Sequence, residues 1–538
     1  MGYNNEDRLE NENIEKIIDG MTLKEKIGQM VMVGFVGKEV NQSITKMIEK
    51  YKIGGIIFFA RNFSNPKQAA ELSAKLQKLS LQSTQIPLFL STDEEGGIVT
   101  RVKGMTHFPG PMALGATDNQ HLTEEIAQAK GEQLKYLGIN FNLSPVLDVN
   151  NNPQNPIIGV RSFGSDPGRV AQHGKSYLKG LQSENVIACG KHFPGHGDTS
   201  TDSHLNLPVI NHKLDHLKNV ELIPFKNAID NGIDSIMIAH IAFPTLTGRD
   251  DLPATLSSEI ITNLLRKELG FQGLIITDCM EMKGISSTFG TVEGAIQTVK
   301  AGSDQILISH TPSKQIEAID KLLEVVKNGE IKEARIDNSL KRILKQKQEK
   351  ISNQQTPEYK KEKFNIYLNK GNNLSQKVSR QAVTVYSDPE NNIPLKPKDY
   401  EKLVLLDLSK NVTSPVENRG ENEGWDNKEL LRKTLENKGY DIEEVTQKDL
   451  EKLEKSRTKD SAVIVLLKNF SLNSPEHKMI KKLNKSSKPV LAVCQGNPYS
   501  AVKINDTAVI FIYDNSPAHI EPLADIIEGQ EVPTGKLP

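Results

Sequence analysis

The chain has 538 residues, with 67 Lys plus Arg against 68 Asp plus Glu and a formal net charge of −1. This length exceeds one ordinary core and predicts two or three domains. The charge balance excludes the basic excess of a non-specific nucleic-acid binder, so we expect no nucleic-acid partner. Three cysteines without a CxxC pair do not form a disulfide framework, and Cys189 and Cys279 lie in apolar runs typical of core positions.

The N-terminal sequence, MGYNNEDRLENENIEK, is polar and acidic. It lacks the basic start and the apolar run of a secretory signal. No segment of the sequence has the length needed to span a membrane. We therefore expect a cytoplasmic protein with no membrane span. A secreted or cell-wall-associated protein whose leader had been removed would have the same sequence.

Short apolar runs alternate with amphipathic stretches between about residues 25 and 350. Eight such runs with helical crossovers predict a (β/α)₈ barrel over residues 1–350. Helices are expected at 67–79 and 257–269, and the helix at 334–350 would close the barrel. The predicted strands are 27–35, 54–59, 86–93, 141–149, 186–192, 235–241, 273–280 and 305–309.

A charged, Asn- and Gln-rich passage at 351–372 predicts a linker with some helix. Residues 373–538 then restart the alternation of helix and strand, with an amphipathic stretch at 427–440. They predict a C-terminal αβα sandwich, a parallel sheet covered by helices on both faces, so the overall class is α/β. Its buried strands are expected at 402–408, 462–468, 489–496 and 508–514.

Polar residues collect where the predicted barrel strands end. Barrel active sites are built from that face, which makes these residues candidates for a site. They are Asp93, Asp148, Lys191, His192, His240 and Asp278.

The segment KHFPGHGDTSTDSH (191–204) contains one lysine, three histidines and two aspartates within 14 residues. One interpretation is a metal site, but Pro194 and Gly195 interrupt regular ligand spacing and no second pair completes a structural zinc site. The other is acid–base chemistry. Asp202 can fix the tautomer of His204 two residues on, so that the imidazole donates a proton to a leaving oxygen and later takes one from water.

This segment resembles the signature of glycoside hydrolase family 3, in its bacterial β-N-acetylglucosaminidase branch, with the loop pattern KH-x-PG-x-G-x₄-DSH. The resemblance implies that Asp202 and His204 form the general acid/base dyad. It also extends to GLIITDCMEM (273–282), where Asp278 falls at the position of the catalytic nucleophile. Removal of Asp278 should then abolish turnover.

The same resemblance implies the substrate contacts. STDEEGGIVTRV (91–102) is similar to the family's DxEGG-x₃-R segment, and SPVLDVNNNPQNPIIGVRSFGSDP (144–167) to its next strand and loop. The implied contacts to the sugar are Asp93, Arg101, Arg161, Lys191 and His192.

Each of these residues also has a structural interpretation. Asp93 fits a charged turn, and Arg101 and Arg161 fit ion pairs at the barrel rim. A carboxylate such as Asp278 at the end of an apolar strand is costly to bury unless cations such as Lys191 offset that cost.

The resemblance implies a retaining glycosidase that removes terminal β-linked GlcNAc from GlcNAc–MurNAc fragments of peptidoglycan. We expect no cofactor, since no phosphate-binding GxGxxG follows a strand, and no metal. Arg61 and Asn62 follow an early strand and are candidates to meet the anionic aglycone, although ARN also fits an ordinary loop. The C-terminal domain, which ends in VPTGKLP, is expected to be structural, and the protein a monomer.

Alternatives remain open from the sequence. They are attack by the substrate's own acetamido group, phosphorolysis in place of hydrolysis, β-glucosidase activity, and a catalytically inactive sugar-binding protein. A histidine acid/base permits phosphorolysis because, when neutral, it does not repel an incoming phosphate, but hydrolysis is the reaction we expect.

Overall fold

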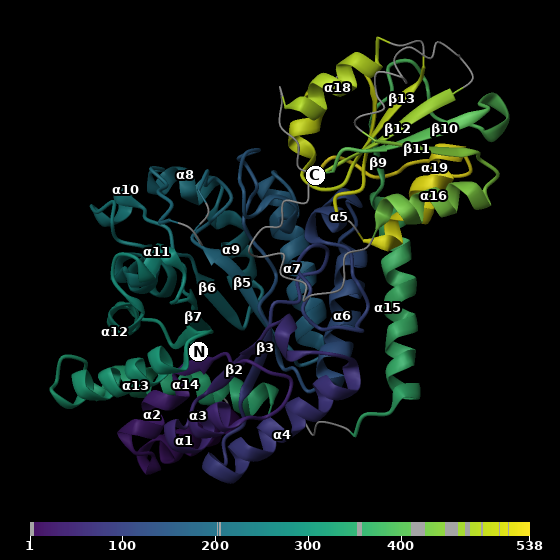
Figure 1. Ribbon diagram of the computed structural model, residues 1–538. Coiled ribbons are helices and arrows are strands. Elements are labelled where there is room, and N and C mark those ends of the chain that lie inside the picture. The colour runs from purple at the N-terminus through teal and green to yellow at the C-terminus, as the bar shows by residue number, and fades with distance from the viewer. Residues whose placement is uncertain are drawn as a thin grey trace.

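The computed structural model describes residues 5–201, 203, 206–351, 358–409, 426–446, 461–468, 474–485, 488–504, 506–514 and 516–538. Eight parallel strands, paired in chain order from β1 to β8, close into a barrel, and helices surround it (Figure 1). The predicted (β/α)₈ barrel is therefore confirmed. The strands are β1 Val31–Val33, β2 Gly55–Phe58, β3 Phe89–Thr92, β4 Phe141–Asn142, β5 Ile187–Phe193, β6 Ser235–Ile238, β7 Leu274–Cys279 and β8 Gln305–Ile308.

Each barrel strand falls within one of the eight predicted runs, except that β5 continues one residue further to Phe193, and the strands are shorter than most of the runs. Residues 27–29 belong to a helix, so β1 is short. In the run 141–149 the ladder stops after Asn142, and Val146 alone resumes it in a bridge to Lys191. Pro145 lies between them and has no N–H for a ladder bond. This early end leaves Asp148 in irregular backbone beside β5.

Polar caps begin many of the surrounding helices, as at Asn65 before α4 and Asp166 before α7, where each side chain accepts a backbone N–H and proline follows. The predicted helix at 257–269 is a π-helix, η4 Glu259–Glu268. The others are α1 Asn5–Gly20, α2 Leu23–Gln29, α3 Gln42–Tyr51, η1 Ala60–Asn62, α4 Pro66–Thr84, α5 Pro111–Ala116, α6 Gln120–Tyr136, η2 Gly159–Arg161, α7 Pro167–Ser183, α8 Leu214–Asn219, α9 Leu222–Asp230, α10 Pro244–Thr247, η3 Ala254–Leu256, α11 Lys283–Ser286, α12 Thr291–Ala301, α13 Pro312–Lys327 and α14 Glu333–Lys350.

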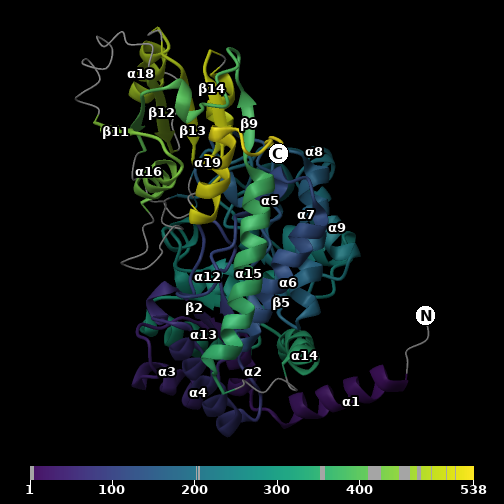
Figure 2. The ribbon, with the colours of Figure 1, turned by 90° about the vertical axis from the view of Figure 1, so that its right-hand side faces the viewer.

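Helix α15 (Lys361–Ala382) occupies most of the predicted linker at 351–372 and continues beyond it. It runs along the side of the barrel up to the second domain (Figure 2). Its Phe364 stacks on Tyr136 of α6, with ring centroids 5.8 Å apart. Gln133 of α6 also donates to the carbonyl of Tyr367. This part of the chain is therefore a packed helix rather than a free connection.

The second domain is a six-stranded sheet in the order β11-β10-β12-β13-β14-β9. The predicted all-parallel sheet is wrong at one edge, because β9 pairs antiparallel with β14. Strand β11 has no counterpart in the prediction, since its sequence IEEV is half-exposed at the other edge and carries no apolar run. The strands are β9 Thr384–Ser387, β10 Lys402–Asp407, β11 Ile442–Val445, β12 Ser461–Leu467, β13 Val490–Cys494 and β14 Ala508–Phe511.

Helices cover both faces of this sheet, as predicted, but the barrel supplies part of one cover. One apolar cluster joins the sheet to α16 and α19. The other joins it to α18 and to Met112, Ala113 and Ala116 of α5, which belongs to the barrel domain. The remaining elements are η5 Pro397–Asp399, α16 Asn427–Asn437, α18 Pro475–Leu483, η8 Pro498–Lys503, η9 Pro517–His519 and α19 Ile520–Glu528. Over the described ranges, no helix is long and apolar enough to cross a membrane.

A buried carboxylate ties the two domains together. Asp514, after β14, accepts the backbone N–H of Gly110 at 2.8 Å and that of Ser516 at 2.8 Å. His519 Nε2 lies 3.0 Å from Asp514 Oδ1, the oxygen that also accepts the N–H of Ser516. Burial would raise the pKa of Asp514, but His519 and these donors outweigh burial and lower it to about 2.

We expect Asp514→Ala to lower the free energy of unfolding by about 3 kcal/mol, because two buried N–H groups and His519 lose their acceptor. Urea unfolding at neutral pH measures this. The matched control is Asp399→Ala at an exposed position of the same domain, expected within about 0.5 kcal/mol of the wild type. Equal midpoints for Asp514→Ala and the wild type would contradict the role of this contact.

Candidate active site

The strand-end residues meet at the carboxyl mouth of the barrel. Asp93 directly follows β3, while Lys191 and Asp278 lie near the ends of β5 and β7. The charges of Asp93, Lys191 and Asp278 all act on the buried thiol of Cys189. Burial raises its pKa to about 12, the carboxylates of Asp93 and Asp278 add to that rise, and Lys191 opposes it. Because these strands are parallel and belong to one closed barrel, the two predicted carboxylates and the predicted lysine lie around the same barrel mouth.

A buried ion network forms the floor of this site. Lys191 Nζ lies 2.7 Å from Asp93 Oδ1 and 2.7 Å from Glu95 Oε1. Arg161, from η2, holds Glu95 in two parallel hydrogen bonds of 2.9 and 2.8 Å. Two cations thus face two carboxylates, and only Asp93 is appreciably exposed, at 18% of its side chain.

The network favours the charged forms of Glu95 and Lys191 despite their burial. Burial alone would raise the pKa of Glu95, but Arg161 and Lys191 outweigh it and lower that pKa well below its usual range. Burial likewise opposes the charge of Lys191, yet Asp93 and Glu95 raise the pKa of Lys191 above its usual value. Lysine has three N–H donors and two are held here, so the third remains for a ligand.

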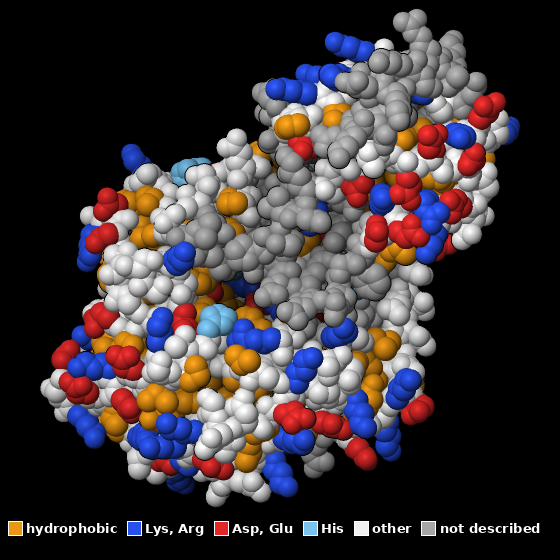
Figure 3. All heavy atoms as spheres, viewed as in Figure 1, with side chains coloured by type: hydrophobic (Ala, Val, Ile, Leu, Met, Phe, Trp, Pro, Cys, Tyr) orange, Lys and Arg blue, Asp and Glu red, His pale blue; other side chains and the backbone are white. Residues whose placement is uncertain are grey.

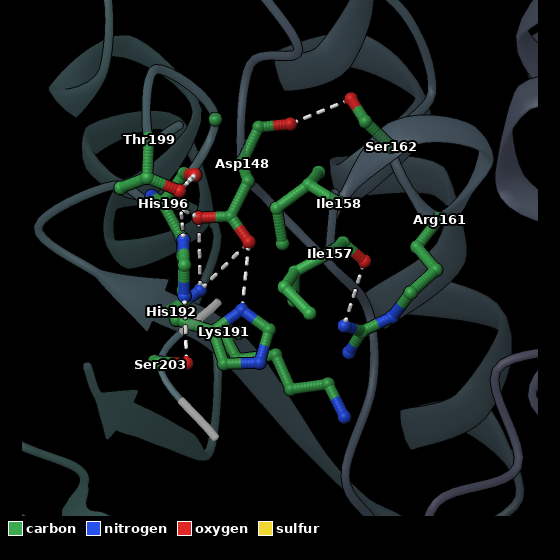
Figure 4. A network of polar contacts seen from close by, with 12 residues as sticks. Asp148, Ile157, Ile158, Arg161, Ser162, Lys191, His192, His196, Thr199 and Ser203 are labelled. Carbon is green, nitrogen blue, oxygen red and sulfur yellow. Dashed lines mark hydrogen bonds and ion pairs between the residues drawn. The ribbon is translucent and has the colours of Figure 1, made fainter. Parts of the chain in front are cut away.

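Asp148 orients His192. The Nδ1 atom of His192 lies 2.7 Å from Asp148 Oδ2, and the carboxylate also accepts the backbone N–H groups of His192 and His196. A carboxylate only accepts, so Nδ1 carries the proton and Nε2 is left to face a ligand. Asp148 is fully buried, so it acts on the site through the orientation of His192. Figure 4 shows this contact beside Lys191 and Arg161.

Two glycines of the 191–204 segment allow its loop to lie against the barrel. A Cβ on Gly197 would stand 1.6 Å from the carbonyl oxygen of Val149, which no side chain can tolerate. Gly195 has φ +139° and a Cβ there would meet the side chain of Glu221 at 2.7 Å. The motif's glycines are thus required by close approach.

His196 clamps the same loop. Thr199 donates its only hydroxyl proton to the carbonyl of His196, so His196 Nδ1 must donate to Thr199 Oγ1, at 2.8 Å. The other nitrogen, Nε2, then accepts from Ser203 Oγ at 3.0 Å (Figure 4). Burial, with His192 nearby, lowers the pKa of His196 to about 4, in agreement with a neutral ring. Asn155 supports the turn by donating to the carbonyls of His196 and Gly197.

Asp202 and His204, the predicted acid/base pair, lie outside the described residues, and their roles stay predictions. Ser203 between them is described and buried. Asp278 is partly exposed at the end of β7. His240 Nε2 lies 2.9 Å from the carbonyl of Cys279, which links the ends of β6 and β7 beside Asp278.

Three residues that the sequence analysis named as candidate contacts remain to be placed. Arg101 is 7% exposed and its backbone N–H donates to Glu94. Arg61 lies at the mouth, where its guanidinium donates to the carbonyls of Phe35 and Ser309. Asn62 is fully buried and donates to the carbonyls of Phe35 and Gly37, so it serves the fold and does not face an aglycone.

Sequence reasoning missed Glu95 and His196. Both stand inside segments that it singled out, Glu95 next to Asp93 in STDEEGG and His196 between the two glycines of PGHG. For Glu95 the available signal was the run of three carboxylates in that turn, which need buried cation or hydrogen-bond partners if the turn packs against the barrel.

The closed barrel with charged residues at the carboxyl ends of its strands is the architecture of a barrel enzyme. Residues 22–346 match the Glycosyl hydrolase family 3 N terminal domain. That match covers more than half of the chain, and the chain belongs to glycoside hydrolase family 3.

Relatives within the family are β-hexosaminidases by name. β-Hexosaminidase A of Pseudoalteromonas piscicida is 38% identical over 326 residues, which are 56% of this chain and 54% of that protein. The chain thus matches about half the length of that relative. β-Hexosaminidase LpqI of Mycobacterium tuberculosis is 32% identical over 333 residues, 60% of this chain and 82% of that protein.

A solved structure is similar over both domains. The family 3 β-N-acetylglucosaminidase from Paenibacillus sp. str. FPU-7 superimposes with a TM-score of 0.86 at 38% identity, covering 96% of this chain and 99% of that one. The likeness therefore includes the second domain.

We expect Glu95→Gln to lower the free energy of unfolding by about 3 kcal/mol or more, because Arg161 and Lys191 would remain buried with one compensating charge fewer. Chemical unfolding monitored by circular dichroism measures the change. Glu71→Gln, at an exposed position of α4, is the control and should leave stability within about 0.5 kcal/mol. A Glu95→Gln variant as stable as this control would contradict the network's role.

The lowered pKa of His196 predicts a pH dependence of stability. Between pH 6.5 and about 4 the unfolded chain binds a proton that the buried ring does not, so stability falls as the pH falls through this window. His196 accounts for roughly 3 kcal/mol of that loss. Equilibrium unfolding at several pH values should give a shallower decline for His196→Gln than for the wild type. If the free energy of unfolding of His196→Gln declined with falling pH as steeply as that of the exposed control His121→Gln, this role of His196 would be ruled out.

Proposed function

We propose that the chain is a retaining, exo-acting β-N-acetylglucosaminidase that hydrolyses terminal β-linked GlcNAc, with Asp278 as its nucleophile. The observation that carries this proposal is the convergence of Asp278 with Asp93 and Lys191 at the barrel mouth, one carboxylate bound by a cation and the other partly exposed. Family membership and the names of the relatives support the substrate class.

The side chains that hold the sugar are already fixed by hydrogen bonds or ion pairs to other residues of the site. Asp93 uses Oδ1 for Lys191, which leaves Oδ2 to accept a sugar hydroxyl. Lys191 keeps one N–H and His192 keeps Nε2 for the same ring. Because the ion network and Asp148 hold these side chains before the sugar arrives, little conformational entropy is lost on binding.

Catalysis proceeds through a glycosyl-enzyme. Asp278 attacks the anomeric carbon, the bond to the leaving oxygen breaks, and His204 supplies the proton that oxygen needs. His204, oriented by Asp202, then removes a proton from water, which attacks the same carbon and releases Asp278. The β configuration is retained because two inversions occur.

Peptidoglycan fragments with GlcNAc linked to MurNAc are the proposed substrates, and Arg61 at the barrel mouth is a candidate contact for their anionic aglycone. Release of p-nitrophenol from the β-GlcNAc glycoside, compared with the β-glucoside, tests the sugar. Faster cleavage of the β-glucoside would contradict the proposal. Repeating the reaction in phosphate buffer and finding GlcNAc 1-phosphate as the main product would replace hydrolysis by phosphorolysis.

We expect Asp278→Asn to lower kcat by about 10⁴-fold or more at unchanged stability, and His204→Gln by about 10²–10⁴-fold. Steady-state kinetics measures both, with Asp251→Asn, in an exposed pair with Arg249, as a control at wild-type rate. A fluorinated N-acetylglucosaminyl fluoride should label the peptide that contains Asp278. Normal turnover by Asp278→Asn would exclude this nucleophile, and substrate-assisted attack would leave the protein unlabelled.

A further inference from the structure

Two histidines and a glutamate form a cluster at the edge of the 191–204 loop that the catalytic proposal does not use. His212 precedes α8, His216 lies within it and Glu221 directly precedes α9. Figure 3 shows histidine side chains at the surface in the region of α8. The exposed fractions of the side chains of His212, His216 and Glu221 are 31%, 44% and 0%, so the cluster reaches from solvent to a buried carboxylate.

The spacing of the three residues suits a metal ion. One ligand atom from each lies within 4.8 Å of the others, and His216 Nε2 is 3.6 Å from Glu221 Oε1. Zn²⁺ with bonds of about 2.0–2.2 Å in a tetrahedron places neighbouring ligand atoms about 3.3–3.6 Å apart. The imidazole rings of the two histidines are stacked, with centroids 4.0 Å apart and planes inclined by 28°, so the partly exposed His216 must rotate for both rings to bind one ion.

The buried carboxylate provides an independent indication of a ligand. Glu221 Oε1 accepts a hydrogen bond from Asn151 at 3.1 Å. Its second oxygen, Oε2, is buried and contacts no hydrogen-bond donor within the described ranges. A buried carboxylate oxygen without a donor is costly, and a cation bound at that place would remove the cost.

His212 is already oriented as a metal ligand would be. Its Nε2 lies 2.6 Å from the carboxylate of Asp198, which leaves Nδ1 for coordination. Histidine ligands commonly donate their second N–H to a carboxylate in this way. Asp198 belongs to the 191–204 loop, and Glu221 packs against Gly195 of the same loop.

We propose that His212, His216 and Glu221 form a binding site for Zn²⁺, with Asp198 orienting His212 and solvent completing the coordination. Two imidazoles and one carboxylate favour Zn²⁺ over Mg²⁺ and Ca²⁺, which prefer oxygen ligands. Metal bound there links α8 and the start of α9 to the loop through Asp198.

The test is titration of the chelator-treated full chain with Zn²⁺ in competition with a chromophoric indicator. We expect one tight equivalent per chain, and a visible spectrum of a low-coordinate site when Co²⁺ replaces Zn²⁺. His216→Ala and Glu221→Gln should each weaken binding about 100-fold, and Asp198→Asn about 10-fold, with thermal unfolding of the metal-free variants close to that of the wild type. Mg²⁺ and Ca²⁺ at equal concentration should not compete.

Two controls locate the metal. His121→Gln, an exposed histidine on α6, should bind Zn²⁺ as the wild type does. His204→Gln should also retain the tight equivalent, since the proposed ligands are elsewhere. Loss of binding in His204→Gln with retention in His216→Ala and Glu221→Gln would overturn the proposal in favour of the catalytic loop. Absence of a tight equivalent in the wild type would overturn it outright.

Discussion

The pairing of Lys191 and Arg161 with the buried carboxylate of Glu95 is the interaction on which the site depends. It joins the turn after β3, the loop after β4 and the end of β5. Buried charges are tolerated only when they are matched in number and geometry. Because Glu95 takes two hydrogen bonds from Arg161 and one contact from Lys191, the network has one arrangement, and that arrangement fixes Asp93 toward the barrel mouth.

The loop that follows β5 is built on the same rigid base but by different means. Gly197 presses on the backbone of Val149, and His196 holds Thr199 and Ser203 through a neutral ring. The proposed sugar-binding groups thus come from strand ends, while the proposed proton chemistry belongs to the loop. The second domain completes this frame without supplying a proposed catalytic group, since α5 of the barrel packs on its sheet and Asp514 binds Gly110.

Sequence patterns predicted the elements that apolar burial determines. The eight barrel strands coincide with eight apolar runs because parallel strands covered on both sides are mainly apolar, with polar residues gathered toward their carboxyl ends. Strand β11 and the antiparallel direction of β9 were not predictable in this way, since edge strands carry polar residues and direction depends on how the chain enters the sheet. Glu95 illustrates the limit for the site: its neighbours in sequence indicate a charged turn, and its partners Arg161 and Lys191 are distant in sequence. The boundary between the domains and the Asp202–His204 pair stay predictions.

The account's central claim is that the prearranged strand-end groups hold a terminal GlcNAc with its anomeric carbon toward Asp278. A crystal structure of the Asp278→Asn variant with a GlcNAc-terminated oligosaccharide tests it most directly. The account predicts sugar hydroxyls on Asp93, Lys191 and His192, with the anomeric carbon within about 3–3.5 Å of the side chain at position 278. A sugar bound away from these residues, or with its anomeric carbon turned from position 278, would contradict it.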